Sequence, residues 1–211
     1  MKIIGLMGNS GVGKDTMANH LVSKYGFVKI AFADPFKRVV KDIYDFSENV
    51  LWGPAEGKNV GDARYPRPDG TLLSPRIAMQ TIGSEWGRNC YPETWTKYLE
   101  RATRQILDGA SYTPIRGIYH EPGKQPSYAG IIISDCRFQN ELDVVRRLQG
   151  YVVRLKRANV TESKSKQLGI GSHDSEMEQL TIPDSDLDFV IEVPEGIPNF
   201  HVAIDEFIKK L

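Results

Sequence analysis

The sequence predicts an α/β fold with a doubly wound parallel sheet of about five strands flanked by helices. Three observations lead to this prediction. A short apolar run, Ile3 to Met7, passes through a glycine-rich turn into helix-forming residues. Apolar runs of strand length then alternate with stretches of helical periodicity, which is typical of strands joined by helical crossovers. The run from Gly130 to Ser134 is apolar almost throughout, as expected for a strand buried on both faces.

Apolar runs and helix-start signals place the individual elements. Asp34 and Pro35 form an N-cap followed by proline at the first helical position. Behind them, Phe36, Val39 and Ile43 recur at helical spacing. We expect strands at 3–7, 27–32, 130–134, 151–155 and 189–193. We expect helices at 16–25, from 34 to about 43, and at 75–88, 92–108, 138–149 and about 200–210.

Two segments do not fit this alternation. Residues 47–73 contain several glycines and prolines with few periodic apolar positions, which predicts a long, mobile loop. Residues 110–129 are polar and contain three prolines, so we expect a second excursion from the sheet.

Composition narrows the class of protein. The 211 residues suffice for one sizeable α/β domain. Basic and acidic residues number 27 each, so no net charge favours nucleic acid or a membrane surface. The first residues lack the apolar region of a signal peptide, and no apolar run is long enough to span a bilayer. Cys90 and Cys136 show no zinc or disulfide spacing. We therefore expect a cytoplasmic protein with reduced thiols.

The turn after the first strand carries a phosphate-binding pattern. Gly8, four further residues and then Gly13 and Lys14 match the Walker A spacing. Asp15 stands where a serine or threonine hydroxyl normally ligates Mg²⁺, and Thr16 follows one place later. Amides of such a loop and the positive end of the helix dipole attract polyphosphate. The alternative is a tight strand-to-helix turn that happens to be rich in glycine.

The pattern assigns a hypothetical role to each residue of this loop. Lys14 would grip the β- and γ-phosphates of ATP, Asp15 would bind Mg²⁺ directly or through water, and Thr16 would donate to the α- or β-phosphate. The predicted ATP-binding residues of the loop are Gly11, Val12, Gly13, Lys14, Asp15 and Thr16.

A second group of charged residues follows the apolar strand at 130–134. Asp135 lies at the strand tip, the position of a Walker B carboxylate that orients Mg²⁺. Arg137 can stabilise the phosphoryl group in transfer, and Glu141 lies one helical turn further on the same face. A surface ion pair with an N-cap aspartate is the alternative.

The helix at 75–88 has a comparable polar face. Arg76, Gln80, Gly83 and Ser84 follow i, i+4, i+7 and i+8 spacing. Such a wall suits a nucleobase and its 5′-phosphate, although spacing alone favours a solvated helix face.

Taken together, these pieces resemble one family. The sequences Gly-Lys-Asp-Thr at 13–16, Phe-Ala-Asp-Pro-Phe-Lys at 32–37 and Leu-Trp-Gly-Pro at 51–54 are similar to segments of the phage-type deoxynucleoside monophosphate kinases, in the P-loop NMP-kinase superfamily. So are 75–88, Ser-Asp-Cys-Arg-Phe-Gln-Asn-Glu at 134–141 and His-Asp-Ser-Glu at 173–176. Their order and spacing cover nearly the whole chain.

The resemblance implies ATP-dependent phosphorylation of a deoxynucleoside monophosphate (dNMP), with ATP as co-substrate and Mg²⁺. Lys14, Asp15 and Arg137 would be catalytic, and Asp15 and Asp135 would hold the metal. Trp95 would line the acceptor site, although its apolar stripe fits a core position equally well. The implied acceptor residues are Arg76, Gln80, Gly83, Ser84, Trp95, Asp135, Arg137 and Glu141.

The same resemblance implies a single P-loop kinase domain over 1–211. Its mobile insertions would be about 47–73 and a lid at about 157–172, with Arg157 near ATP. Small-molecule nucleotides are the expected partners, in the host cytoplasm if the protein is phage-encoded, and a homodimer is compatible with the family. Two alternatives remain open. One is another P-loop kinase, similar to phosphomevalonate or dephospho-coenzyme A kinases, and the other is a nucleotide-dependent switch.

Overall fold

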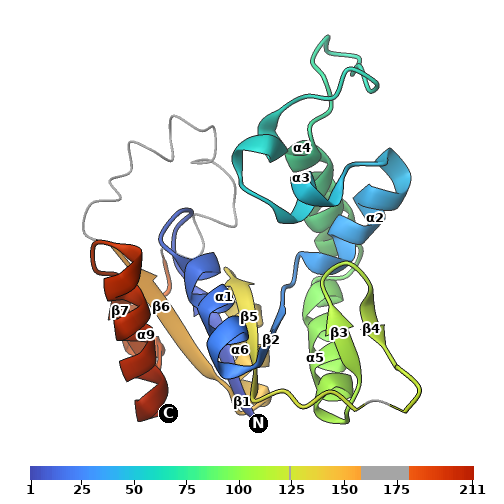
Figure 1. The fold of residues 1–211 in the computed structure, drawn as a ribbon. Helices are drawn as coiled ribbons and strands as arrows, with labels where there is room; N and C mark the ends of the chain where they lie inside the picture. Colours follow the sequence, from blue (N-terminus) through green and yellow to red (C-terminus); the bar gives the residue numbers. More distant parts are fainter. Residues whose placement is uncertain (124, 158–180) are drawn as a thin grey trace.

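A five-stranded parallel sheet forms the centre of the computed structural model, which describes residues 1–123, 125–157 and 181–211 (Figure 1). The strands lie in the order β2-β5-β1-β6-β7, so β1 is central, with β5 and β2 on one side and β6 and β7 on the other. This arrangement confirms the predicted doubly wound sheet. The strand bounds are β1 Lys2–Met7, β2 Phe27–Ile30, β5 Gly130–Cys136, β6 Tyr151–Lys156 and β7 Phe189–Glu192.

Helices cover both faces of this sheet. Because side chains alternate along a strand, Ile3 and Ile4 of β1 join different core clusters. Ile4 packs with α1 and α9, whereas Ile3 lies in the cluster built from α5 and α6. The helices are α1 Lys14–Tyr25, α2 Asp34–Tyr44, α3 Glu48–Trp52, α4 Pro75–Gln80, α5 Thr94–Leu107, α6 Gln139–Arg147 and α9 Ile197–Lys210.

The parallel register brings three chain segments to one edge of the sheet. Lys2 pairs with Gly130 at the start of β1 and β5, and Met7 pairs with Cys136 at their ends. On the other side of β5, Ile30 pairs with Ile133. The glycine-rich turn, the tip of β5 and the start of α2 therefore meet at the carboxyl edge, where ligands of such sheets bind.

The segment at 47–73, predicted as a long loop, contains two short helical elements. Ser47 caps α3 by accepting a hydrogen bond from the amide of Val50, and Leu51 of α3 is fully buried. A 3₁₀ turn, η1 Glu56–Asn59, follows. Leu51 packs in a small separate core with Val40 and Ala78. One buried residue in a five-residue helix gives no periodicity, which explains why the sequence pattern did not reveal it.

Three other segments differ from the prediction in detail. Residues 110–129 contain an antiparallel hairpin, β3 Ser111–Thr113 with β4 Gly117–Tyr119. The expected helix at 75–88 is α4 continued by a π-helical segment, η2 Thr81–Arg88. A further 3₁₀ turn, η3 Asp184–Asp186, precedes β7.

Parts of the sequence-based prediction lie outside the described residues. These are positions 158–172 of the expected lid and the segment at 173–176. Arg157 is described and is exposed at the end of β6. In the described part of the chain, no helix is long and apolar enough to cross a membrane.

Candidate active site

The glycine-rich loop connects β1 to α1 in a conformation that glycine makes possible. Gly8 and Gly13 have φ angles of 141° and 116°, which side chains rarely adopt. A Cβ atom would lie 2.6 Å from the carbonyl oxygen of Leu155 at Gly8, and 2.9 Å from Phe200 Cε1 at Gly13. The loop is therefore held close to its neighbours, as a backbone cradle for phosphate requires.

Side chains of the loop divide into an anchor and polar groups. Val12 is 2% exposed and packs into the core beside Phe200. The ammonium of Lys14 curls back over the loop and donates to the carbonyl oxygens of Gly8 at 2.5 Å and Asn9 at 2.9 Å. The hydroxyl of Thr16 makes no hydrogen bond to the described residues. Val12 thus supports the loop, while Lys14 lies over it.

Asp15 is an ionised carboxylate beside the loop. Its side chain is 83% exposed, and its Oδ1 lies 2.6 Å from the ammonium of Lys29 on β2. Loss of hydration beside the loop opposes ionisation, but Lys29 and then Lys14 and Lys37 outweigh it and lower the pKa of Asp15 below its usual value.

Asp135 joins the tip of β5 to the start of α2. Its two carboxylate oxygens accept hydrogen bonds from the amides of Phe32 at 2.8 Å and Ala33 at 3.0 Å. Burial, followed by the neighbouring carboxylate of Asp34, raises the pKa of Asp135. Asp34 itself is 2% exposed and accepts from the Tyr112 hydroxyl at 2.7 Å. Asp135 therefore fixes the geometry of the sheet edge.

The expected role of Glu141 as a phosphate-binding residue is contradicted by its surroundings. Glu141 is 3% exposed, and its Oε2 accepts from the amides of Arg137 at 2.7 Å and Phe138 at 3.2 Å. Its Oε1 accepts from the guanidinium of Arg88 at 2.6 Å. A carboxylate would also repel a phosphate. Glu141 instead holds the backbone of Arg137 in place.

Arg88 is a site residue that the sequence reasoning missed. Arg88 lies at the end of η2. Its guanidinium stacks 3.5 Å from the centroid of the Phe138 ring and forms an ion pair with Glu141. Burial raises the pKa of Glu141 to about 7, although Arg88 acts in the opposite direction. The pair connects the helix at 75–88 to the residues after β5. Only its place in the motif at 75–88 could have drawn attention to it.

The polar face of α4 and η2 differs in part from the expectation. Gln80 and Ser84 are partly exposed, and their side chains make no hydrogen bond to described residues. Gly83 does not leave room for a ligand, because a Cβ there would lie 3.3 Å from Phe36. Trp95 is 6% exposed and donates from Nε1 to the Gly83 carbonyl at 2.6 Å.

That position decides between the two roles considered for Trp95. It packs in the core beside α2 and cannot stack on a base in this conformation.

Arg76 of α4 is partly exposed, and its Nε donates to Asn59 of η1. Arg137 follows β5 directly and is also partly exposed. Both arginines therefore belong to elements that end or begin near the carboxyl edge of the sheet.

The donor set fits a magnesium ion that is held mainly by substrate phosphates. Among the described residues, no three histidine, cysteine or acidic side chains converge as a metal site. Mg²⁺ commonly takes only one or two carboxylates from the protein and completes its shell with water and phosphate. Asp15 meets this requirement, being exposed beside the phosphate loop. Asp135 is less suitable, because backbone amides already occupy both of its oxygens.

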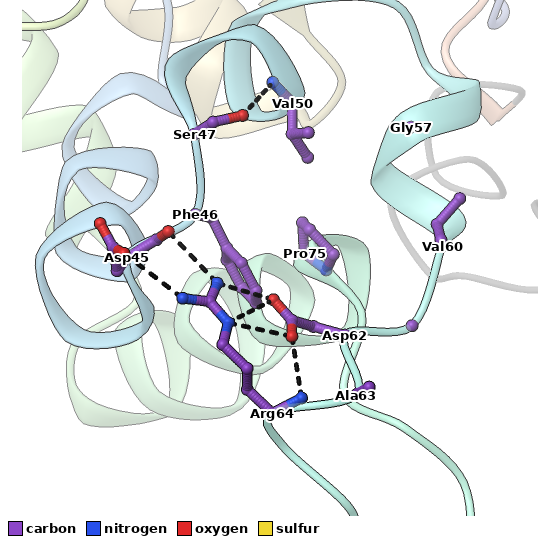
Figure 2. Close-up of a pocket in the computed structure, with 11 residues that line it drawn as sticks. Asp45, Phe46, Ser47, Val50, Gly57, Val60, Asp62, Ala63, Arg64 and Pro75 are labelled. Atoms are coloured by element: carbon purple, nitrogen blue, oxygen red, sulfur yellow. Dashed lines mark hydrogen bonds and ion pairs between the residues drawn. The ribbon is translucent and has the colours of Figure 1, made fainter.

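An open pocket of about 420 Å³ lies away from these residues, between the end of α2 and the segment at 57–64. Figure 2 shows the guanidinium of Arg64 between Asp45 and Asp62, at 3.3 and 2.7 Å. None of the predicted site residues lines this pocket. Its one guanidinium is paired with both of its carboxylates, so we assign the pocket a structural role in fastening 57–64 to α2.

Comparison with known proteins identifies the family. No family model matches the chain. Among solved structures, the dephospho-CoA kinase from Campylobacter jejuni has a TM-score of 0.47 at 16% identity, covering 100% of this chain and 97% of that one. The shikimate kinase from Acinetobacter baumannii also has a TM-score of 0.47, at 11% identity and with 100% and 94% coverage. Both likenesses are too weak to assign a function.

A curated relative is more informative. The chain is 30% identical, over 187 residues, to the "Putative deoxynucleotide monophosphate kinase" of Acanthamoeba polyphaga mimivirus. The match covers 89% of this chain and 86% of that protein. With a phosphate loop at the carboxyl edge of a five-stranded parallel sheet, the chain is a phosphotransferase and belongs to the deoxynucleotide monophosphate kinase family.

Proposed function

We propose that this protein transfers the γ-phosphate of ATP to the phosphate of a deoxynucleoside monophosphate, forming the diphosphate and ADP. The observation that supports this most is the juxtaposition, at one sheet edge, of the phosphate loop and the β5 tip carrying Asp135 and Arg137. One anion site faces a second, as transfer between two phosphates demands.

ATP binding is assigned to the glycine-rich loop and its neighbours. The loop amides and the start of α1 would bind the β- and γ-phosphates. The Lys14 ammonium, which now donates to Gly8 and Asn9, would exchange these carbonyl oxygens for phosphate oxygens. The partly exposed Thr16 would donate from its hydroxyl to the α- or β-phosphate. Asp15 would hold Mg²⁺, which supplies neutralisation of the charge on the phosphates.

The acceptor is assigned to the other side of this edge. Gln80 and Ser84 offer hydrogen-bonding groups that no described residue uses, and Arg76 lies on the same helical stretch. Arg137 would stabilise the phosphoryl group during transfer, with its backbone fixed by Glu141. The acceptor oxygen is already ionised at neutral pH, so the reaction needs orientation and charge neutralisation more than a general base.

The segment at 47–73 would cover the substrates and exclude water, which limits hydrolysis of ATP. Its α3 and η1 give this cover an ordered structure. Positions 158–172 of the expected lid lie outside the described residues.

A panel of acceptors with ATP tests the proposal. We expect dTMP, dGMP, dCMP or dAMP to give rapid ADP formation and a deoxynucleoside diphosphate product. The four ribonucleotides, dephospho-coenzyme A and phosphomevalonate serve as competing acceptors. Preference for either of the last two, measured by kcat/KM, would identify a different small-molecule kinase. ADP release that is independent of any monophosphate would instead indicate a nucleotide-dependent switch.

A further inference from the structure

The turn η1 is fixed against the rest of the molecule rather than free in solution. Its Asn59 accepts a hydrogen bond from Arg76 of α4. The residues after it are tied to the end of α2 through Arg64, which bonds Asp62 at 2.7 Å and Asp45 at 3.3 Å (Figure 2). A side chain carried by η1 therefore has a defined position relative to α2 and α4.

Lys58 of η1 lies within a group of cations at the sheet edge. Its side chain is partly buried, and its ammonium donates to the Gly53 carbonyl at 2.9 Å. The charged groups that act on it come from four elements, namely Lys37 of α2, Asp15 of α1, Arg76 of α4 and Lys29 of β2.

The charges in this group do not balance. Asp15 is the acidic member, and it already lies 2.6 Å from Lys29. Burial first, and then the repulsion from Lys37, lower the pKa of Lys58 to about 8. A partly buried cation that is surrounded mainly by other cations is unfavourable until an anion joins them.

We infer that Lys58 binds the phosphate of the acceptor nucleotide, next to Arg76; this inference rests on the proposed function. The acceptor is the better choice of anion because η1, which carries Lys58, is bonded to α4 through Asn59 and Arg76. Gln80 of α4 and Ser84 of η2 offer hydrogen-bonding groups without described partners. The polyphosphate of ATP has its own ligands in the loop amides and Lys14. The segment at 47–73 thus contributes a substrate ligand as well as a cover.

Steady-state kinetics of two Lys58 variants test this inference. Lys58→Gln keeps a polar side chain, one atom shorter, without the charge, and Lys58→Arg keeps the charge. Lys209→Gln, exposed in the last turn of α9, controls for the loss of one surface charge. We expect Lys58→Gln to raise the KM for the best dNMP by about tenfold to a hundredfold, as expected for a charge-assisted contact. The KM for ATP should stay within about twofold, and Lys58→Arg should recover most of the affinity.

A pH profile and a binding measurement separate this role from a structural one. In the wild type, kcat/KM for the dNMP should fall as the pH rises past about 8, because Lys58 loses its proton there. The Lys58→Arg variant should keep its value above that pH. Calorimetric titration of the dNMP without ATP should show the same loss of affinity in Lys58→Gln, while circular dichroism confirms that the variant is folded.

The outcomes distinguish failure of the inference from failure of the proposed function. If the wild type phosphorylates a dNMP but Lys58→Gln binds it equally well, the inference alone is wrong. An increase confined to the KM for ATP also overturns it. If the wild type neither binds nor phosphorylates any dNMP, the proposed function fails and the inference with it.

Discussion

Replacing Glu141 by glutamine tests how burial and charge are balanced at the residue that holds Arg137. Glu141 is buried, bonded to two backbone amides and paired with Arg88 at 2.6 Å. Its pKa rises from the ordinary 4.5 to about 7 because loss of hydration outweighs the attraction of Arg88. The folded protein therefore binds this proton more tightly than the unfolded chain does.

The sign and size of the effect on stability follow from this difference. The stabilisation linked to the proton is fully present below pH 4.5 and is lost as the pH rises through 7. At 1.36 kcal/mol for each tenfold change in proton affinity, the wild type loses about 2 to 3 kcal/mol from this residue between pH 5 and pH 8. Glutamine cannot ionise, so Glu141→Gln lacks this loss.

Urea unfolding at pH 5, 6, 7 and 8 and constant ionic strength measures the effect. The free energy of unfolding of the wild type, minus that of Glu141→Gln, should decrease by about 2 to 3 kcal/mol across this range. Glu206→Gln, an exposed position on α9, controls for the loss of one negative charge. A difference that is constant with pH, or that increases with pH, refutes the reasoning, because Arg88 would then dominate over burial.

Four further substitutions test other parts of the site. Lys14→Ala should lower kcat by at least about a hundredfold. Arg137→Ala should raise the KM for the acceptor and also lower kcat by about a thousandfold. Near-normal turnover of a dNMP in both variants would contradict the assignment. Gly13→Ala should cost about 1 to 3 kcal/mol in urea unfolding, because it forces a Cβ against Phe200 in a strained backbone conformation. Trp95→Phe should lose about 1 kcal/mol of stability with its hydrogen bond, yet keep the KM for the acceptor. A large rise in that KM would restore Trp95 to the substrate site.

Sequence patterns predicted the sheet well because each strand carries its own local signal. The apolar run at 130–134 is β5, buried along nearly its whole length. The glycine spacing at 8–13 predicted the turn between β1 and α1 for the same reason, since the required backbone conformation is encoded within a few residues.

The parts that were missed depend on contacts between distant residues. The resemblance assigned Glu141 to the substrate. Its partner, Arg88, lies 53 positions away, so the sequence pattern did not show that the two residues form a pair. The role inferred for Lys58 depends on charged groups from four elements, none of them adjacent to Lys58 in the sequence. The polar face at 75–88 was drawn with α-helical spacing, but the π-helical turn of η2 changes that spacing after residue 80.

Transfer of labelled phosphate tests the central claim most directly. The protein, Mg²⁺ and ATP labelled in its γ-phosphate are incubated with each dNMP, and the products are separated by chromatography. The account predicts that the label appears in the β-phosphate of the deoxynucleoside diphosphate, and that Lys14→Ala abolishes most of this transfer. Label found only in inorganic phosphate, or on an acceptor that is not a nucleoside monophosphate, would contradict it.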